Sequence, residues 1–565
     1  MAISEHPAAA EAATTAAYTE SRTHEVTNQP PPLVGYDVFA QDAALTEGLR
    51  REGAGWAEET LRDVGRAAGS PEAIAWGFAA NEYPPVLHTH DRYGHRIDEV
   101  EFHPAWHALM NRAVSWGLHA SSWREPKLGA HVARTAAFFV WSQVEGGHGC
   151  PISMTHAVIP ALRTEPAVAA EWEPRILSLV YDPGLRPASE KRGILCGMGM
   201  TEKQGGSDVR ANTTRAEPVG SSGEYVLTGH KWFCSAPMCD VFLMLAQAPG
   251  GLTCFLVPRV LPDGARNHIF IQRLKDKLGN RSNASSELEL ERAWAVRIGP
   301  EGRGVRTIVE MVNSTRLDCL TGTASLMRQA VAQAIHHTAH RAAFGKTLID
   351  QPLMRNVLAD LAIESEAATT LMLRLARAVD GAAAGDPHEA HLKRIGIAIG
   401  KYWVCKRGPV HVAEALECLG GNGYVEESIM PRLYREAPVN SVWEGSGNVI
   451  CLDVLRAMGK EPETVAAYFA EVSAARGADA RLDAAVASLQ RDLADHSNIE
   501  IRARRLVERL ALVLQGALLV RSAPPAVADA FCASRLAGDW GAAFGTLPAG
   551  TDFAAIVERA RPRVD

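Results

Sequence analysis

The sequence predicts a mainly helical α+β protein with several domains. Its 565 residues are enough for about three to five domain-sized units, at roughly 100–200 residues for each unit. Long segments with apolar residues three and four apart enclose one stretch of short strands, and a further helical tail follows them. No alternating strand–helix–strand run occurs, which excludes a doubly wound parallel sheet.

The predicted elements fall into five consecutive segments. The first is a disordered leader that ends in the proline run Gln29-Pro-Pro-Pro32, and we expect order to begin soon after it. Short segments rich in β-branched and aromatic residues predict an antiparallel β domain between helical segments. The predicted boundaries are 1–41 for the leader and spacer, 42–193 for the N-terminal helical domain, 194–298 for the β domain, 299–455 for the C-terminal helical domain and 456–565 for an additional helical domain.

Composition and charge exclude several classes of protein. Hydrophobic residues make up 47% of the chain and charged residues 22%, which favours large buried cores over a disordered or membrane-spanning chain. The 58 basic and 65 acidic side chains leave a formal net charge of −7, so a wholly basic nucleic-acid binder is not expected. The 10 cysteines stand singly, and the N-terminus has no basic segment followed by an apolar one. We therefore expect a cytoplasmic protein with reduced thiols.

One stretch is dense in histidine but lacks the spacing of a metal site. These histidines have no associated cysteine, so hydrogen-bonded or surface imidazoles are favoured over a metal centre, and no metal is expected. The motifs of zinc peptidases, P-loop nucleotide binders and α/β-hydrolases are also absent. The histidines are His88, His90, His95, His103 and His107.

A glycine-rich segment in the predicted β domain offers a backbone that a flat polar ligand or a phosphate can approach closely. It contains Gly205-Gly206-Ser207-Asp208, with a further hydroxyl at Thr201. Spacing alone equally allows a plain turn capped by Ser and Asp. The strand that follows carries Phe233-Cys234-Ser235, an aromatic and a hydroxyl group that can pack against a heterocycle, and this favours the ligand site.

Glu444 is the candidate catalytic base. It lies between Trp443 and a Gly-Ser-Gly turn that opens a predicted helix. Desolvation by such neighbours would raise the pKa of its carboxyl and suit it to remove a proton from a carbon acid. A lone glutamate at this position is also explained as a helix N-terminal residue that the helix dipole stabilises.

Together these segments resemble the acyl-CoA dehydrogenases, and most closely their AidB-like branch, named for the adaptive response to alkylation. The resemblance covers nearly the whole chain from about Asn28, and it implies the fold of that family. It also implies a bound FAD and an acyl-CoA substrate, short or branched, from which Glu444 takes the α-proton while flavin N5 accepts hydride. The segments are TEKQGGSD at 201–208, GHKWFCSA at 229–236, RAAFG at 341–345, CLGGNGY at 418–424 and WEGSGN at 443–448.

The resemblance assigns roles residue by residue. Some relatives carry the base on the long helix after the β domain, but Val312-Asn-Ser-Thr-Arg316 has no carboxylate, which leaves Glu444. Arg316 matches a family arginine near the acyl-CoA. Arg341 and Phe344 match residues that reach the FAD of a neighbouring subunit, which implies a homo-oligomer, usually a tetramer. The implied cofactor contacts are Met198, Met200, Thr201, Gly206, Ser207, Phe233, Cys234, Ser235, Arg341, Phe344, Gln351, Trp443, Gly445, Ser446 and Asn448.

The tail beyond residue 456 leaves a second hypothesis open. The AidB-like branch implies a tail associated with double-stranded DNA, in a flavoprotein that protects DNA and has weak or vestigial dehydrogenase activity. The tail carries 14 basic and 14 acidic side chains, which is not typical of a strong DNA binder. Arg502, Arg505 and Arg509 share one helical face as candidate DNA contacts, although the solvated edge of an amphipathic helix explains them equally.

Overall fold

The computed structural model describes residues 23–220 and 223–564. The predicted leader and spacer span 1–41, and their residues 1–22 lie outside the described ranges. After the proline run, four apolar side chains are buried in the helical core, and their burial favours order there. The hydroxyl of Tyr36, for example, donates to Gln329 Oε1 at 3.2 Å. The four side chains are Leu33, Tyr36, Val38 and Phe39.

Helices form most of the N-terminal segment, as predicted, and capping residues fix where several of them begin. Ser70 accepts a hydrogen bond from Ala73 N ahead of Pro71, a residue pair that favours a helix start. The hairpin β1–β2 was not predicted, because its strands are mostly exposed and carry little apolar pattern. The elements are α2 (Ala43–Arg51), α3 (Glu58–Ala68), α4 (Pro71–Glu82), β1 (Val86–His90), β2 (Arg96–Glu101), α5 (Pro104–Ser115), α6 (Ser121–Arg124), α7 (Ala130–Ser142), α8 (Gly149–Ala157), α9 (Ile159–Leu162) and α10 (Pro166–Ile176).

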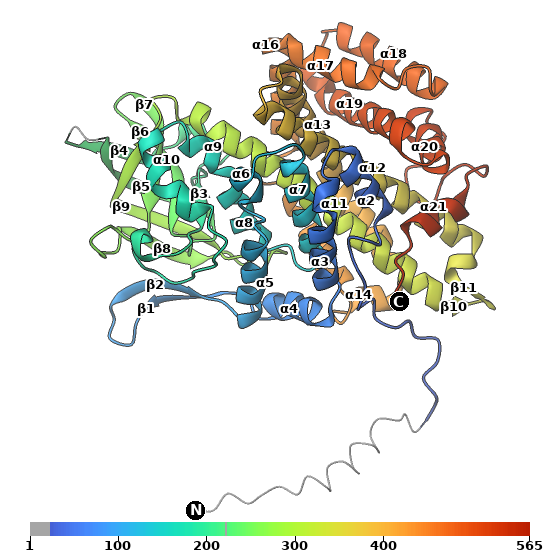
Figure 1. The fold of residues 1–565 in the computed structure, drawn as a ribbon, viewed down its shortest axis with the longest axis horizontal. Coiled ribbons are helices and arrows are strands. Elements are labelled where there is room, and N and C mark those ends of the chain that lie inside the picture. The colour runs from blue at the N-terminus through green and yellow to red at the C-terminus, as the bar shows by residue number, and fades with distance from the viewer. Residues whose placement is uncertain (1–22, 221–222, 565) are drawn as a thin grey trace, which may run out of the picture.

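Seven strands form the β domain, which lies to one side of the helices (Figure 1). Their order is β3-β6-β4-β5-β9-β7, β8 also pairs with β9, and β6 pairs with β7, so the sheet closes on itself around an apolar core. Most pairings are antiparallel, but β3 and β4 run parallel to β6, which corrects the prediction of an antiparallel domain throughout. The strands are β3 (Cys196–Gly199), β4 (Arg215–Val219), β5 (Glu224–Ser235), β6 (Val241–Ala248), β7 (Gly251–Pro258), β8 (Ile269–Leu274) and β9 (Ser285–Ile298).

Three long helices, α11, α12 and α13, form the centre of the C-terminal bundle. They share one apolar core with the N-terminal helices and with the tail, whose helix α19 packs against α12, α13 and α16. The elements are α11 (Gly304–His340), β10 (Ala342–Ala343), β11 (Lys346–Thr347), α12 (Pro352–Ala383), α13 (Pro387–Glu417), α14 (Gly421–Tyr424), α15 (Met430–Glu436), α16 (Gly447–Lys460), α17 (Pro462–Ser473), α18 (Ala480–Ala494), α19 (Ile499–Ser522), α20 (Pro525–Phe531) and α21 (Phe553–Ala560).

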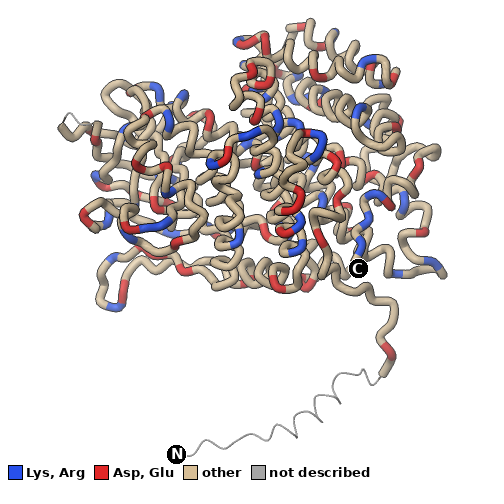
Figure 2. Tube along the Cα trace, in the orientation of Figure 1, with Lys and Arg blue, Asp and Glu red and all other residues tan. Residues whose placement is uncertain are grey.

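The arrangement confirms the predicted fold class, with a β domain set between helical segments and a further helical tail. Figure 2 shows that basic and acidic side chains are interspersed along the chain. Within the described ranges, no helix combines the length and the apolar character that crossing a membrane requires.

Candidate functional site

The glycine-rich loop after β3 is held by a buried ion pair that the sequence analysis did not identify. Glu202 and Lys231 are both fully buried, and the lysine Nζ lies 2.9 Å from the carboxylate Oε1. Four more hydrogen bonds reach the same carboxylate, from the side chain of Gln204, the backbone and hydroxyl of Thr213, and the backbone of Thr214. Burial alone would raise the pKa of Glu202, but Lys231 and the hydrogen bonds hold it at about 2.

The loop that Glu202 holds lies beside the end of β5. The backbone N–H of Trp232 donates to the carbonyl of Thr201 at 2.9 Å, which joins the two segments that the sequence analysis proposed for one ligand. Of the predicted contacts in this region, Met198 and Cys234 are buried, Met200, Thr201 and Ser235 are half-buried, and Gly206, Ser207 and Phe233 are exposed.

Three observations test whether these residues fit a flavin. Gly205 has a φ of +134°, and a Cβ added to it would meet nothing within 4 Å, so the loop backbone is open to a ligand. The ring of Phe233 is 56% exposed. The side chain of Asn283 is almost fully buried, and the thiol of Cys150 is the one described group that its amide interacts with. Open backbone, an exposed aromatic face and a buried amide fit the apolar faces and polar edge of an isoalloxazine ring.

Glu444 lies in the short loop that precedes α16. Its backbone has a φ of +58°, a left-handed conformation that is uncommon for a residue other than glycine. The hydroxyl of Thr315 on α11 donates to Glu444 Oε2 at 2.9 Å. Burial raises the pKa of the Glu444 carboxyl above its ordinary value, and Thr315, Arg316 and Lys401 partly oppose that rise. These features suit a carboxylate that accepts a proton near neutral pH.

The guanidinium of Arg316 bonds to groups of the protein itself. Its Nε donates to the backbone carbonyl of Glu444 at 3.0 Å, and its Nη1 lies 2.7 Å from Asp453 Oδ2. Only 8% of Arg316 is exposed, so its guanidinium holds the loop of Glu444 rather than standing free for a ligand.

Cys150, at the start of α8, connects the two halves of the site. Burial raises the pKa of its thiol to about 11, a hydrogen bond with Ser235 lowers it, and the charge of Glu444 raises it. The thiol therefore responds both to the end of β5 and to the charge of Glu444.

The other residues predicted around Glu444 line its loop. The indole of Trp443 is half-buried and donates to Asn440 Oδ1 at 3.1 Å. Gly445 has a φ of +105°, which favours glycine there. Ser446 is the N-cap of α16, and both Ser446 and Asn448 are exposed.

Arg341, Phe344 and Gln351 lie far from Glu444. They follow α11, and the rest of that helix beyond Thr315 spans about 25 residues, or about 38 Å at 1.5 Å per residue. Phe344 is 98% exposed and has a φ of +53°, while Gln351 Nε2 donates to Ala343 O at 3.0 Å in the same hairpin. Arg341 Nη1 donates to Asn28 O. These residues therefore lie at the opposite end of α11 from Thr315 and Glu444.

The three arginines proposed for DNA contact differ in their surroundings. Arg502 pairs with Asp495 at 2.5 Å, and Arg509 pairs with Asp492. Arg505 is exposed. Two of the three positive charges are thus neutralised within the tail.

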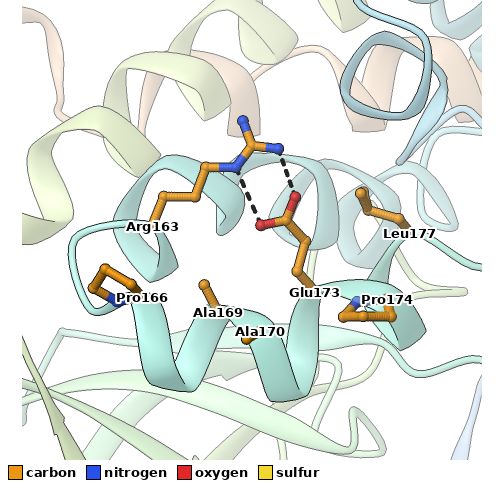
Figure 3. Close-up of a pocket in the computed structure, with 7 residues that line it drawn as sticks. All are labelled: Arg163, Pro166, Ala169, Ala170, Glu173, Pro174 and Leu177. Carbon is orange, nitrogen blue, oxygen red and sulfur yellow. Dashed lines mark hydrogen bonds and ion pairs between the residues drawn. The ribbon is translucent and has the colours of Figure 1, made fainter.

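Two other regions carry no comparable chemistry. A hollow beside α10 has Arg163 and Glu173 facing each other across it in an ion pair, and it shares no lining residue with the site above (Figure 3). In the histidine-dense stretch, His88 pairs with Glu101 and His95 with Asp91. The described part of the chain contains no group of three or more His, Cys, Asp or Glu side chains arranged to hold a metal ion.

Comparison with known proteins agrees with the geometry. Residues 28–183 match the model of the adaptive response protein AidB N-terminal domain, 197–293 that of the acyl-CoA dehydrogenase middle domain, and 302–459 that of the acyl-CoA dehydrogenase C-terminal domain.

Individual relatives extend over most of the chain. AidB of Escherichia coli strain K12, named as an acyl-CoA dehydrogenase, is 48% identical over 90% of this chain and 94% of that protein. Acyl-CoA dehydrogenase family member 11 of Caenorhabditis elegans is 30% identical over 79% of this chain and 77% of that protein. The crystal structure of C. elegans ACDH-11 in complex with C11-CoA superimposes with a TM-score of 0.85 at 27% identity, over 92% of this chain and 95% of that chain.

Proposed function

Because this chain belongs to the acyl-CoA dehydrogenase family of FAD-dependent oxidoreductases, we propose that it desaturates an acyl-CoA with Glu444 as the catalytic base. The observation that carries the proposal is the setting of Glu444, a half-buried carboxylate whose Oε2 accepts a hydrogen bond from Thr315 in a loop that precedes α16. The alternative explanation, a helix N-terminal glutamate, accounts for neither the left-handed backbone nor the hydrogen bond from Thr315.

The proposed chemistry divides between the cofactor and the protein. FAD, when bound, supplies the acceptor for the hydride that leaves the β-carbon of the acyl chain. Thr201, Ser207, Phe233 and Ser235 would hold it. Glu444 takes the α-proton: Thr315 occupies its Oε2 and leaves Oε1 to the substrate, and burial makes the carboxylate a stronger base than one in water.

We propose a short or branched acyl-CoA as the substrate. The C. elegans neighbour is described in complex with C11-CoA, which extends the range of chain lengths to be tested. We further propose that the active form is a homo-oligomer, a tetramer by family resemblance. The distance of Arg341 and Phe344 from Glu444 and the exposure of Phe344 support a shared flavin site between copies.

The experiment is a screen of the purified protein against acyl-CoAs from four to eleven carbons, straight and branched, with an artificial electron acceptor. The wild type should contain FAD and reduce the acceptor with at least one substrate. Glu444→Gln should retain FAD and lose turnover, because the amide has nearly the same shape but cannot accept a proton at neutral pH. Turnover by Glu444→Gln at the wild-type rate would require another base.

DNA association is a second candidate, and the adaptive-response name of the matched N-terminal family model favours it. In this case phosphate contacts would come from surfaces of the oligomer, since Arg502 and Arg509 are paired with aspartates. Binding to duplex DNA measured at low and at moderate salt tests this candidate, and failure to bind at low salt would remove it.

A further inference from the structure

Two cations bind three consecutive backbone carbonyls in the Glu444 loop. Lys401 Nζ on α13 donates to the carbonyl of Trp443 at 2.9 Å and to that of Gly445 at 2.5 Å. Arg316 on α11 donates to the carbonyl between them, that of Glu444 itself, and also pairs with the carboxylate of Asp453. The loop is therefore fastened on both sides of the base by side chains from two long helices.

Lys401 is an unusual residue for the interior of a helical bundle. It is 1% exposed, and among the described residues no carboxylate lies within ion-pair distance of its ammonium. A buried ammonium that forms no ion pair costs stability, and a methionine of similar length would fill the same space without that cost. Packing alone therefore does not explain a lysine here.

The loop itself also holds a strained conformation. Glu444 has a φ of +58°, and left-handed residues other than glycine persist only where the surroundings hold them. The peptide unit before this residue is held by Lys401 through the Trp443 carbonyl, and the one after it by Arg316 through the Glu444 carbonyl. Lys401 also holds the next carbonyl along the chain, that of Gly445. Fixing these peptide units sets the direction in which the Glu444 side chain leaves the backbone.

We propose that Lys401 is a positioning residue for the base: its ammonium holds the carbonyls of Trp443 and Gly445 and so keeps the Glu444 carboxylate aimed at the substrate. This inference rests on the proposed function of Glu444. Lys401 itself touches neither the carboxylate nor a reacting atom.

The ammonium also acts on the carboxylate through its charge. Burial raises the pKa of Glu444 and Lys401 lowers it, so loss of the ammonium should raise this pKa further. The charged and titratable groups that face Glu444 from the packed helices are Arg316 and Cys319 on α11, Lys401 on α13, Cys150 on α8 and Asp453 on α16, which is paired with Arg316.

The test compares Lys401→Met with the matched control Lys393→Met. Lys393 lies on the same helix and pairs with Glu310 away from the loop. Hydrogen exchange of the peptide 442–449 should become faster in Lys401→Met and stay unchanged in the control, whereas a general loss of stability would accelerate exchange throughout the chain. This measurement needs no turnover. It therefore tests whether Lys401 holds the Glu444 loop even if no acyl-CoA is a substrate and the proposed function fails.

Kinetics give the second measurement. We expect the kcat of Lys401→Met to fall about 100-fold with FAD retained, because a displacement of about 1 Å at the base has an effect of that order. The acidic limb of its kcat profile should also move to higher pH. Lys401→Gln keeps a donor without the charge, so it should show the pH shift with a smaller loss of kcat, and it serves as the test if the methionine variant does not fold. Wild-type exchange at 442–449 in Lys401→Met would overturn the proposal, and so would an unchanged pH profile in a variant that turns over.

Discussion

Replacement of Lys231 by Met should loosen the glycine-rich loop by about 3 kcal/mol, because it removes the cation from a fully buried ion pair. The figure is the lower end of the cost of about 3 to 5 kcal/mol for breaking a buried ion pair by removing one partner. The lower end applies because the other hydrogen bonds to the carboxylate remain.

Hydrogen exchange of the peptides that cover 200–235 measures this loss. A decrease of about 3 kcal/mol in the free energy of local opening should accelerate exchange there about 150-fold at pH 7. Lys203→Met is the control, since it removes an exposed lysine from the same loop and should change the opening free energy by no more than about 0.5 kcal/mol. Glu202→Gln combined with Lys231→Met should be less destabilised than the sum of the single changes, with a coupling of about 2 kcal/mol.

The same pair gives the loop a defined response to acid. Glu202 has a lowered pKa in the folded protein, so its contribution is fully present above about pH 4.5 and is lost as the pH falls toward 2. The free energy of local opening in 200–235 of the wild type, taken from exchange relative to the intrinsic rate at each pH, should fall over that window, and that of Lys231→Met should respond less. If Lys231→Met accelerated exchange in 200–235 by less than about threefold at pH 7, the ion pair would not be the support of the loop. The same would follow if the free-energy changes of the two single variants simply added up in the double variant.

Three further outcomes are expected. Phe344→Ala should weaken FAD retention and lower the oligomeric state in light scattering, since the ring is 98% exposed in the single chain; a variant that stays assembled with full flavin would exclude this ring from a shared site. Replacing Arg502, Arg505 and Arg509 together by Ala should change affinity for duplex DNA little, because only Arg505 lacks an aspartate partner; a flattened salt dependence would contradict this. The kcat should fall as the pH is lowered, with a midpoint above 4.5 set by the raised pKa of Glu444, and a midpoint below 4.5 would be inconsistent with burial of the base.

The order of domains was predictable because each has its own hydrophobic period. Apolar residues three and four apart mark the helices, and the run Val241–Ala248 is apolar at nearly every position, as expected of a central strand. The hairpin at 86–101 was missed because its side chains alternate between exposed and half-buried positions and are largely polar. The direction of β3 was missed because a short apolar strand carries no signal of the partner with which it pairs.

The segments proposed for the site stand out in the sequence, but the residues that support those segments do not. Glu444, Ser207 and Phe233 stand in segments that a family resemblance identifies. The partners of these segments are distant in sequence: Thr315 lies 129 residues from Glu444, and Lys231 lies 29 residues from Glu202. No periodic pattern in the sequence links residues so far apart, so these contacts could not be predicted. One signal was available for Lys401, which stands alone in the otherwise uncharged run from Ile395 to Cys405 and so had no exposed helix face to occupy.

The unfavourable features of the Glu444 loop point to function because they occur together. A carboxyl whose pKa is raised by burial, a left-handed backbone and a buried lysine without a carboxylate partner each make the folded chain less stable than a simpler sequence would. Ordinary packing would remove these costs with a glycine in place of Glu444 and a methionine in place of Lys401. In the structure Lys401 instead donates hydrogen bonds to the carbonyls of the residues before and after Glu444, so the destabilising buried ammonium stabilises the strained backbone. Since ionised Glu444 at neutral pH opposes folding, Glu444→Gln should unfold at a higher temperature than the wild type while losing turnover, and a lower unfolding temperature would contradict this account of the loop.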